Sequence, residues 1–126
     1  MRIWIALSGP IASLPPHKAK VRFNEAEHRL DLAARRIDDA VHIWNPTTIP
    51  PDTPYAVALR DCLQQLICAE ASRQRDEIDA CWIVTLEGWR ESNGARAEVA
   101  AARWYGWPVL PLDHAIEHIL AGVQPR

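Results

Sequence analysis

Short apolar runs alternate with longer segments of helical periodicity along this chain, and the alternation constrains the fold more than any other feature. The runs with the composition of buried strands are residues 3–7, 40–44, 80–86 and 108–110. The segments that predict helices are residues 20–36, 54–75, 94–105 and 113–121. Strands that alternate with helices pair in parallel through right-handed crossovers. We therefore expect an α/β fold of the Rossmann-like or flavodoxin-like class, with a parallel sheet of four to five strands and helices on both faces.

Length and composition limit the chain to one domain and argue against several partners. A chain of 126 residues, 48% of them hydrophobic, buries one core, so we expect a single domain over residues 1–126. The net charge of −2 gives no reason to propose nucleic acid or an anionic membrane as a partner. No apolar run approaches the roughly 20 residues of a membrane-spanning helix, so we expect no membrane partner.

The cysteines and histidines predict neither a disulfide nor a metal site. Cys62, Cys68 and Cys81 are odd in number and lack a C-x-x-C spacing. His114 and His118 are four residues apart, but no third ligand is evident. Since the sequence enters a strand pattern at its first residues, we expect no signal peptide. The expectation is a cytoplasmic protein with reduced thiols and no metal or cofactor.

A polar loop follows each of the first three predicted strands. These loops are Ser8-Gly9-Pro10, Asn45-Pro46 and Gly88 to Gly94. Ligands of parallel sheets bind outside the carboxyl ends of the strands. We therefore expect the three loops to converge on one rim of the sheet.

The third loop joins the end of a buried strand to an alanine-rich helix, and it predicts an anion site. The free N–H groups and the dipole of a helix N-terminus favour anions. Glu98 lies about one turn inside this helix and would face the same crevice. We expect the helix N-terminus to hold Glu98 ionised at neutral pH. An anion site beside a fixed carboxylate indicates chemistry on a phosphorylated sugar.

Several short motifs occur in a recognisable order. They are Ser8-Gly9-Pro10-Ile11; Phe23, Ala26 and Leu30 in the pattern F-x-x-A-x-x-x-L; Asn45-Pro46; Asp79 before a strand; Gly88 to Glu98 in the pattern G-W-x-x-S-x-G-A-x-x-E; and Gly106-Trp107-Pro108-Val109. On these motifs the chain resembles the nucleoside 2-deoxyribosyltransferase superfamily. It is most similar to a small branch described as a domain of unknown function, DUF4406, and it also resembles the 2′-deoxynucleoside 5′-phosphate N-hydrolases.

The resemblance implies a nucleotide N-glycosidase that needs no cofactor, with Glu98 as its nucleophile. Ser92 stands six residues before Glu98. Branches that act on free nucleosides tend to have Asp there, and branches that act on 5′-monophosphates tend to have Ser. The implied substrate and phosphate residues are Ser8, Gly9, Pro10, Asn45, Trp89, Ser92, Asn93 and Gly94. A deoxyribosyltransferase and a non-catalytic module that binds a nucleotide or nucleotide sugar remain alternatives.

The chain departs from the superfamily at its second acidic residue. The superfamily usually has this acid about eight positions before the Asp that precedes the strand, and that position is Ala71 here. The candidates are Asp61, which follows an arginine, and Asp76; otherwise the acid is missing. We favour Asp61 as the second catalytic residue and expect Asp79 to cap the start of the strand.

The resemblance also implies that a neighbouring subunit closes the site. The helix predicted at residues 54–75 has more apolar positions than one sheet face readily covers. These positions are Val57, Leu63, Leu66, Ile67 and Ala71. We therefore expect a homo-oligomer, at least a dimer, that binds a small nucleotide substrate.

Overall fold

The structure is a computed structural model that describes residues 1–37, 40–122 and 124–125. Its strands are β1 (Arg2–Ser8), β2 (Ala40–Trp44), β3 (Ala80–Thr85) and β4 (Val109–Pro111). Its α-helices are α1 (Pro16–Ala34), α2 (Tyr55–Gln74), α3 (Asn93–Trp104) and α4 (Leu112–Ala121). Two short 3₁₀ turns, η1 (Pro46–Thr48) and η2 (Trp89–Glu91), lie in the loops after β2 and β3.

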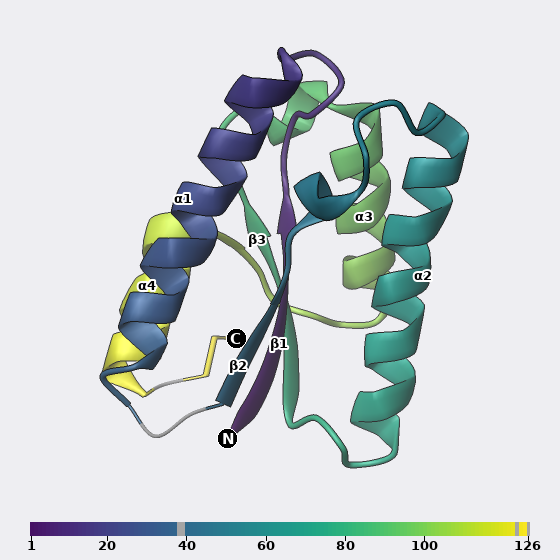
Figure 1. The fold of residues 1–126 in the computed structure, drawn as a ribbon. Helices are drawn as coiled ribbons and strands as arrows, with labels where there is room; N and C mark the ends of the chain where they lie inside the picture. The colour runs from purple at the N-terminus through teal and green to yellow at the C-terminus, as the bar shows by residue number, and fades with distance from the viewer. Residues whose placement is uncertain (38–39, 123, 126) are drawn as a thin grey trace.

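The strands form one parallel sheet in the order β2-β1-β3-β4, and this confirms the expected fold class. Helices α1 and α4 cover one face of the sheet, and α2 and α3 cover the other (Figure 1). The central strand β1 pairs on both sides, so that Ile3 lies opposite Val41 of β2 and Ala80 of β3. The change of direction at β1 and β3 is where a sheet of this kind leaves a crevice for a ligand.

The core consists of two apolar layers, one on each side of the sheet. Ile3, Ile5 and Leu7 of β1 pack in the layer under α1 and α4. Trp4 and Ala6 point the other way, into the layer under α2 and α3. Because successive side chains of a strand point to opposite faces, a strand buried on both faces must be apolar throughout. This explains the unbroken apolar run that predicted β1.

Helix α1 begins at Pro16, four residues before the predicted start. Pro15 is its N-cap and Pro16 its first helical residue. Proline is well suited to the first turn because the N–H that it lacks would have no helical partner there. The earlier start carries His17 and Lys20 into the first turns of α1, beside the loop that follows β1.

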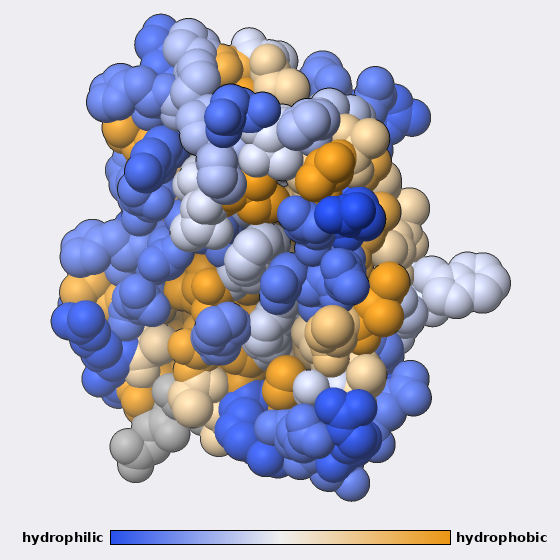
Figure 2. All heavy atoms as spheres, turned by 45° about the vertical axis from the view of Figure 1, so that its right-hand side comes forward, coloured by the Kyte–Doolittle hydropathy of each residue, from blue (hydrophilic) through white to orange (hydrophobic). Residues whose placement is uncertain are grey.

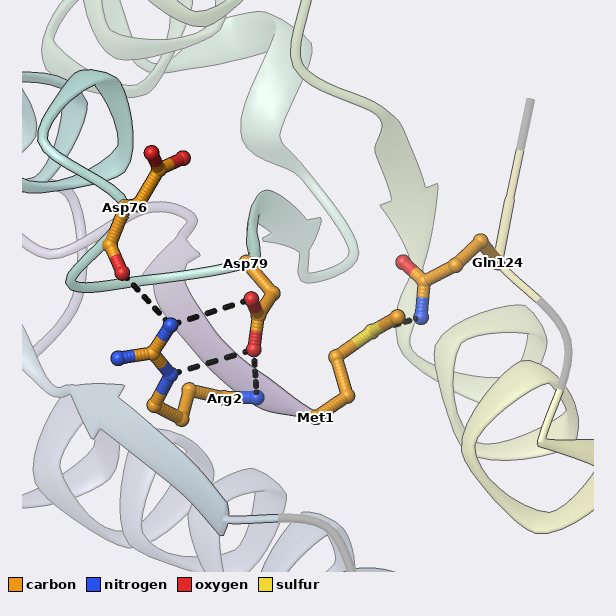
Figure 3. A network of polar contacts seen from close by, with 5 residues as sticks. All are labelled: Met1, Arg2, Asp76, Asp79 and Gln124. Atoms are coloured by element: carbon orange, nitrogen blue, oxygen red, sulfur yellow. Dashed lines mark hydrogen bonds and ion pairs between the residues drawn. The ribbon is translucent and has the colours of Figure 1, made fainter.

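An ion-pair network fixes the amino end of the sheet (Figure 3). The Arg2 backbone N–H donates to Asp79 Oδ2 over 2.7 Å, and the Arg2 guanidinium lies 3.2 Å from Asp79 Oδ1. The same guanidinium donates to the Asp76 carbonyl oxygen over 2.6 Å. Asp79 therefore caps the start of the sheet as expected. Asp76 lies at the end opposite the carboxyl termini of the strands, and this position excludes it as the second acid of a site there.

Two further observations concern membrane-spanning helices and metal ligands. In the described part of the chain, no helix combines the length and the apolar character that crossing a membrane requires. Within the same residues, no group of three or more His, Cys, Asp and Glu side chains is placed to hold a metal ion. Among these residues His114 is exposed on α4.

Candidate functional site

A cavity of about 540 Å³ opens at the carboxyl ends of β1 and β2. Its walls come from the loop after β1, the loop after β2, and the first turns of α1, α2 and α3. Most of the lining is apolar, with Ile11, Leu14, Pro46, Ile49, Pro50, Ala58 and Leu59 among its residues. Three helix N-termini thus meet around one largely apolar space. The expected convergence of the first two polar loops with the start of the Glu98 helix is confirmed.

Glu98 is the one carboxyl among the described residues that line this cavity. It is only 6% exposed, and its Oε2 has no hydrogen-bond partner within the described structure. Burial raises the pKa of Glu98 to about 8. The expectation of an ionised Glu98 at neutral pH is therefore wrong. Glu98 is the sixth residue of α3, and the stabilising effect of a helix N-terminus fades beyond the first turn.

Ser92 and Gly94 lie at the start of α3, and both line the cavity. Ser92 is the N-cap, and its Oγ accepts a hydrogen bond from the Ala95 N–H over 3.3 Å. A hydroxyl that accepts in this way still has its own proton to donate to an anion. A Cβ at Gly94 would lie 3.4 Å from Tyr55 Oη, so the start of α3 lies against the start of α2. Ser92 therefore places one hydroxyl donor at the helix end where the anion site is predicted.

The loop after β1 depends on a close approach at Gly9. A Cβ at Gly9 would lie only 2.9 Å from Leu86 Cβ, which no side chain can accept without a shift of the backbone. Gly9 lines the cavity, whereas Ser8 and Pro10 do not. Ser8 is fully buried, and its hydroxyl donates to the Ala95 carbonyl over 3.5 Å. Ser8 thus ties β1 to α3 behind the cavity.

Asn45 supports the cavity wall from beneath and does not line it. Its Oδ1 accepts from the Thr47 N–H over 3.0 Å and from the Thr47 hydroxyl over 2.6 Å. Its Nδ2 donates to Asn24 Oδ1 over 2.9 Å. These bonds fix η1, and Pro46 and Thr47 of that turn line the cavity. The sequence motif therefore identified the residue that shapes the wall, and it missed Asn24 on α1.

Three other predicted site residues lie away from the cavity. Trp89 belongs to η2 and packs beneath Arg90 and Arg103 on another side of α3. Asn93, the first residue of α3, is exposed. Asp61 is half-exposed on α2 and lies 3.3 Å from the Arg60 guanidinium. The structure thus brings Gly9, Ser92, Gly94 and Glu98 together and leaves these three outside.

Several cavity residues were not among the predicted site residues, and those with polar side chains are His17 and Lys20 of α1, Tyr55 and Cys62 of α2, and Thr47 and Thr53 of the loop after β2. Burial, and then the charge of Glu98, raise the pKa of the Cys62 thiol to about 12, so this thiol is neutral. Tyr55, Leu59 and Cys62 recur at helical spacing on one face of α2. That spacing, at the start of a helix that follows a strand, is the signal that would have revealed them.

The fold and the cavity define the class: a small α/β protein with a cavity at the carboxyl edge of a parallel sheet. The chain belongs to the family described as a domain of unknown function, DUF4406, whose sequence model matches residues 1–111. The match runs from β1 to the end of β4 and so includes every wall of the cavity. None of the curated proteins matched the chain.

The raised pKa of Glu98 predicts a pH-dependent effect on stability. The pKa is about 8 in the folded state against 4.5 for the free side chain, so between these values only the unfolded state releases the proton. The folded state is therefore destabilised as pH rises through this window, and the loss levels off above pH 8. Glu98→Gln removes this penalty. We expect the gain in melting temperature over the parent to be larger at pH 8.5 than at pH 4.5 by at least about 3 °C.

Thermal unfolding followed by circular dichroism at both pH values measures this difference. Glu91→Gln, at an exposed carboxyl in η2, is the matched control and should show the same small change at both pH values. Equal gains for Glu98→Gln at pH 4.5 and 8.5 would show that the Glu98 carboxyl is not held neutral by burial.

Proposed function

We propose that this protein cleaves the N-glycosidic bond of a (deoxy)nucleoside 5′-monophosphate, with Glu98 as the nucleophile. The observation that carries the proposal is the Glu98 carboxyl, which is buried, unpartnered in the described structure and part of the wall of an apolar cavity. A buried ionisable group without a partner is costly to keep and is typical of functional sites. The resemblance of the signature Gly88 to Glu98 to the nucleoside 2-deoxyribosyltransferase superfamily supports the same role.

The chemistry requires a carboxylate close to the anomeric carbon. The C1′–N bond breaks through an oxocarbenium-like state, and its electron pair leaves with the base, which takes up a proton. An oxygen of Glu98 then bonds to C1′ and holds the sugar as an ester. Water attacks this intermediate, and the carboxylate is restored. If a second base replaced the water, the same steps would make the protein a deoxyribosyltransferase.

The polar groups of the cavity suit a phosphate at one end. Ser92 donates a hydroxyl at the start of α3, where the helix dipole also favours an anion. His17 and Lys20 line the same cavity, and within the described part of the chain neither forms an ion pair. Hydrogen bonds from such groups to a phosphate are charge-assisted and strong. The apolar walls suit the flat faces of a nucleobase.

Asp61 remains our candidate for the acid that protonates the leaving base. It adjoins Cys62, which lines the cavity, and the negative charge of Asp61 contributes to the raised pKa of that thiol. Asp61 pairs with Arg60, so the acid role requires its side chain to turn from this partner towards the substrate.

The first prediction under this proposal concerns Glu98. Glu98→Gln keeps the shape of the side chain but removes the nucleophile, so base release should fall by at least about a thousandfold. In the parent, only the ionised form attacks. Since burial sets the pKa of Glu98 at about 8, kcat/KM should rise with pH towards that value as the Glu98 carboxyl ionises. Chromatography of the free base, from a panel of nucleotides and nucleosides, measures both effects.

Two carboxyl variants complete this experiment. Asp76→Asn changes an acid at the far end of the sheet and should leave the rate unaltered. Asp61→Asn should lower the rate by roughly 100-fold if Asp61 is the general acid. A Glu98→Gln protein that keeps more than about a tenth of the parental rate would refute the nucleophile.

The second prediction concerns Ser92 and the phosphate. The parent should act on 5′-monophosphates in preference to the matching nucleosides. Ser92→Asp places a negative charge where the phosphate binds and should erase or reverse that preference, while Asp still caps α3. Ser92→Thr, which keeps the hydroxyl and the cap, is the matched control and should retain the preference. Equal rates of the parent on both substrate types would contradict the phosphate assignment.

A non-catalytic nucleotide-binding module is the second candidate. It is favoured by one observation: Asp61, the best candidate for the second acid, does not line the cavity. The assay above separates the two functions, because a binding module would hold nucleotides without releasing a base.

We also propose that a second copy of the chain covers the outer side of α2 and α3. Figure 2 shows apolar side chains among polar ones on the side of the molecule that comes forward with α2. Ile67 on α2 is 55% exposed and Trp104 on α3 is 88% exposed, whereas Leu66 is fully buried. Tyr55, which lines the cavity, is 53% exposed next to this side. A second copy here would bury these side chains and restrict access of water to the cavity.

The third prediction concerns the oligomeric state of the protein. Light scattering at micromolar concentration should give at least twice the chain mass of 14.2 kDa. Ile67→Glu should return the protein to one chain mass, because it buries a charge at the proposed contact. Leu32→Glu, on the exposed side of α1, is the control and should leave the mass unchanged. A parent with a mass near 14 kDa would refute the assembly.

A further inference from the structure

A second hollow, of about 300 Å³, lies along α3 on a side that does not line the Glu98 cavity. It is lined by Trp89, Arg90, Arg96, Val99, Ala100 and Arg103. The four residues from α3 recur at i, i+3, i+4 and i+7 and so form one stripe on the helix. Three of the six lining residues are arginines, and no acidic residue is among them.

Two of these guanidiniums are held in place by the indole of Trp89. Arg90 Cζ lies 5.1 Å from the centre of the Trp89 ring, and Arg103 Cζ lies 6.0 Å from it. Both distances are within the range of a cation–π interaction. Trp89 itself packs against the core layer under α2 and α3. Arg90 and Arg103 are therefore held against the body of the protein, which reduces the side-chain ordering that ligand binding requires.

No carboxylate lines this hollow to offset the charge of its three arginines. Elsewhere five arginines pair with a carboxylate: Arg2, Arg29, Arg60, Arg73 and Arg75. Within the described part of the chain, Arg90, Arg96 and Arg103 form no ion pair. Three like charges around a half-buried indole repel one another, although the chain as a whole has a net charge of −2. An anion from outside the chain would remove this repulsion.

We propose that the hollow lined by Arg90, Arg96 and Arg103 binds a small soluble anion that carries two linked phosphate groups. A guanidinium group can donate two parallel N–H hydrogen bonds to two oxygens of one phosphate, because the spacing of its N–H groups matches the spacing of those oxygens. Three arginines match the charge of one diphosphate. A nucleic acid that binds through its backbone engages about six to ten phosphates, which is more than this hollow offers. The assignment is independent of the proposed reaction, because Glu98 and Ser92 face a different cavity.

Titration calorimetry with inorganic pyrophosphate at constant ionic strength tests this site. The parent should bind one pyrophosphate per chain, and Arg96→Gln and Arg103→Gln should each weaken binding by at least about tenfold. Arg36→Gln removes an exposed arginine in the turn that follows α1, outside the hollow, and is the matched control, so its affinity should equal that of the parent. Arg96→Lys keeps the positive charge but cannot donate two parallel hydrogen bonds, so this variant should bind pyrophosphate with intermediate affinity. Circular dichroism confirms that each variant is folded.

Ser92→Asp separates this site from the Glu98 cavity. It blocks the phosphate end of the cavity but leaves the arginines in place, so pyrophosphate should still bind. Loss of binding in Ser92→Asp together with full binding in Arg96→Gln would overturn the proposal, as would no heat of binding at millimolar pyrophosphate. A single-stranded oligonucleotide that binds more tightly than pyrophosphate, with the same dependence on Arg96, would also overturn it. None of these results depends on whether the protein releases a base.

Discussion

Burial of β1 is the constraint on which the rest of the structure depends. Its residues from Ile3 to Leu7 are at most 7% exposed, between β2 and β3 and between two helical layers. Both ends of this strand are fixed, by the ion pair of Arg2 with Asp79 and by the close approach of Gly9 to Leu86. The strand cannot slip by one residue without turning its apolar side chains to the wrong faces. Its register therefore determines where the following loop lies, and that loop forms one wall of the Glu98 cavity.

The same packing also buries an ionisable side chain, Glu98, among apolar ones. The inner side of α3 carries Ala95, Val99 and Ala102, all buried and apolar, and Glu98 shares that side. An apolar residue of similar size would avoid the cost of burying a carboxyl group. Burial instead raises the pKa of Glu98 to about 8, which favours the uncharged form at neutral pH. In the reaction that we propose, a developing positive charge on a bound sugar would favour the ionised form of Glu98.

The sequence predicted those features that depend on local periodicity and on topology. The strands and the meeting of Gly9 and Glu98 follow from apolar runs and from the rule that ligands bind at strand carboxyl ends. The ionisation of Glu98 was not predictable, because desolvation depends on side chains of α1 and α2 that are distant in sequence. Asp61 and Cys62 differ by one position, yet about 100° of helix rotation puts only Cys62 in the cavity wall. The sequence of α2 does not separate a polar face from an apolar one clearly, so it does not predict which of these two adjacent residues faces the cavity.

Helix α3 connects the two candidate sites, and its own electrostatics distinguish them. Arg103 lies in the last turn, where the helix dipole stabilises a cation. Arg96 is the fourth residue of α3, near the end where the dipole favours an anion, so the dipole does not account for it. Arg96 gains neither an ion pair within the described residues nor a favourable position on its helix. Its position is favourable when a phosphate binds between it and the two arginines on Trp89, since the anion then lies among three cations.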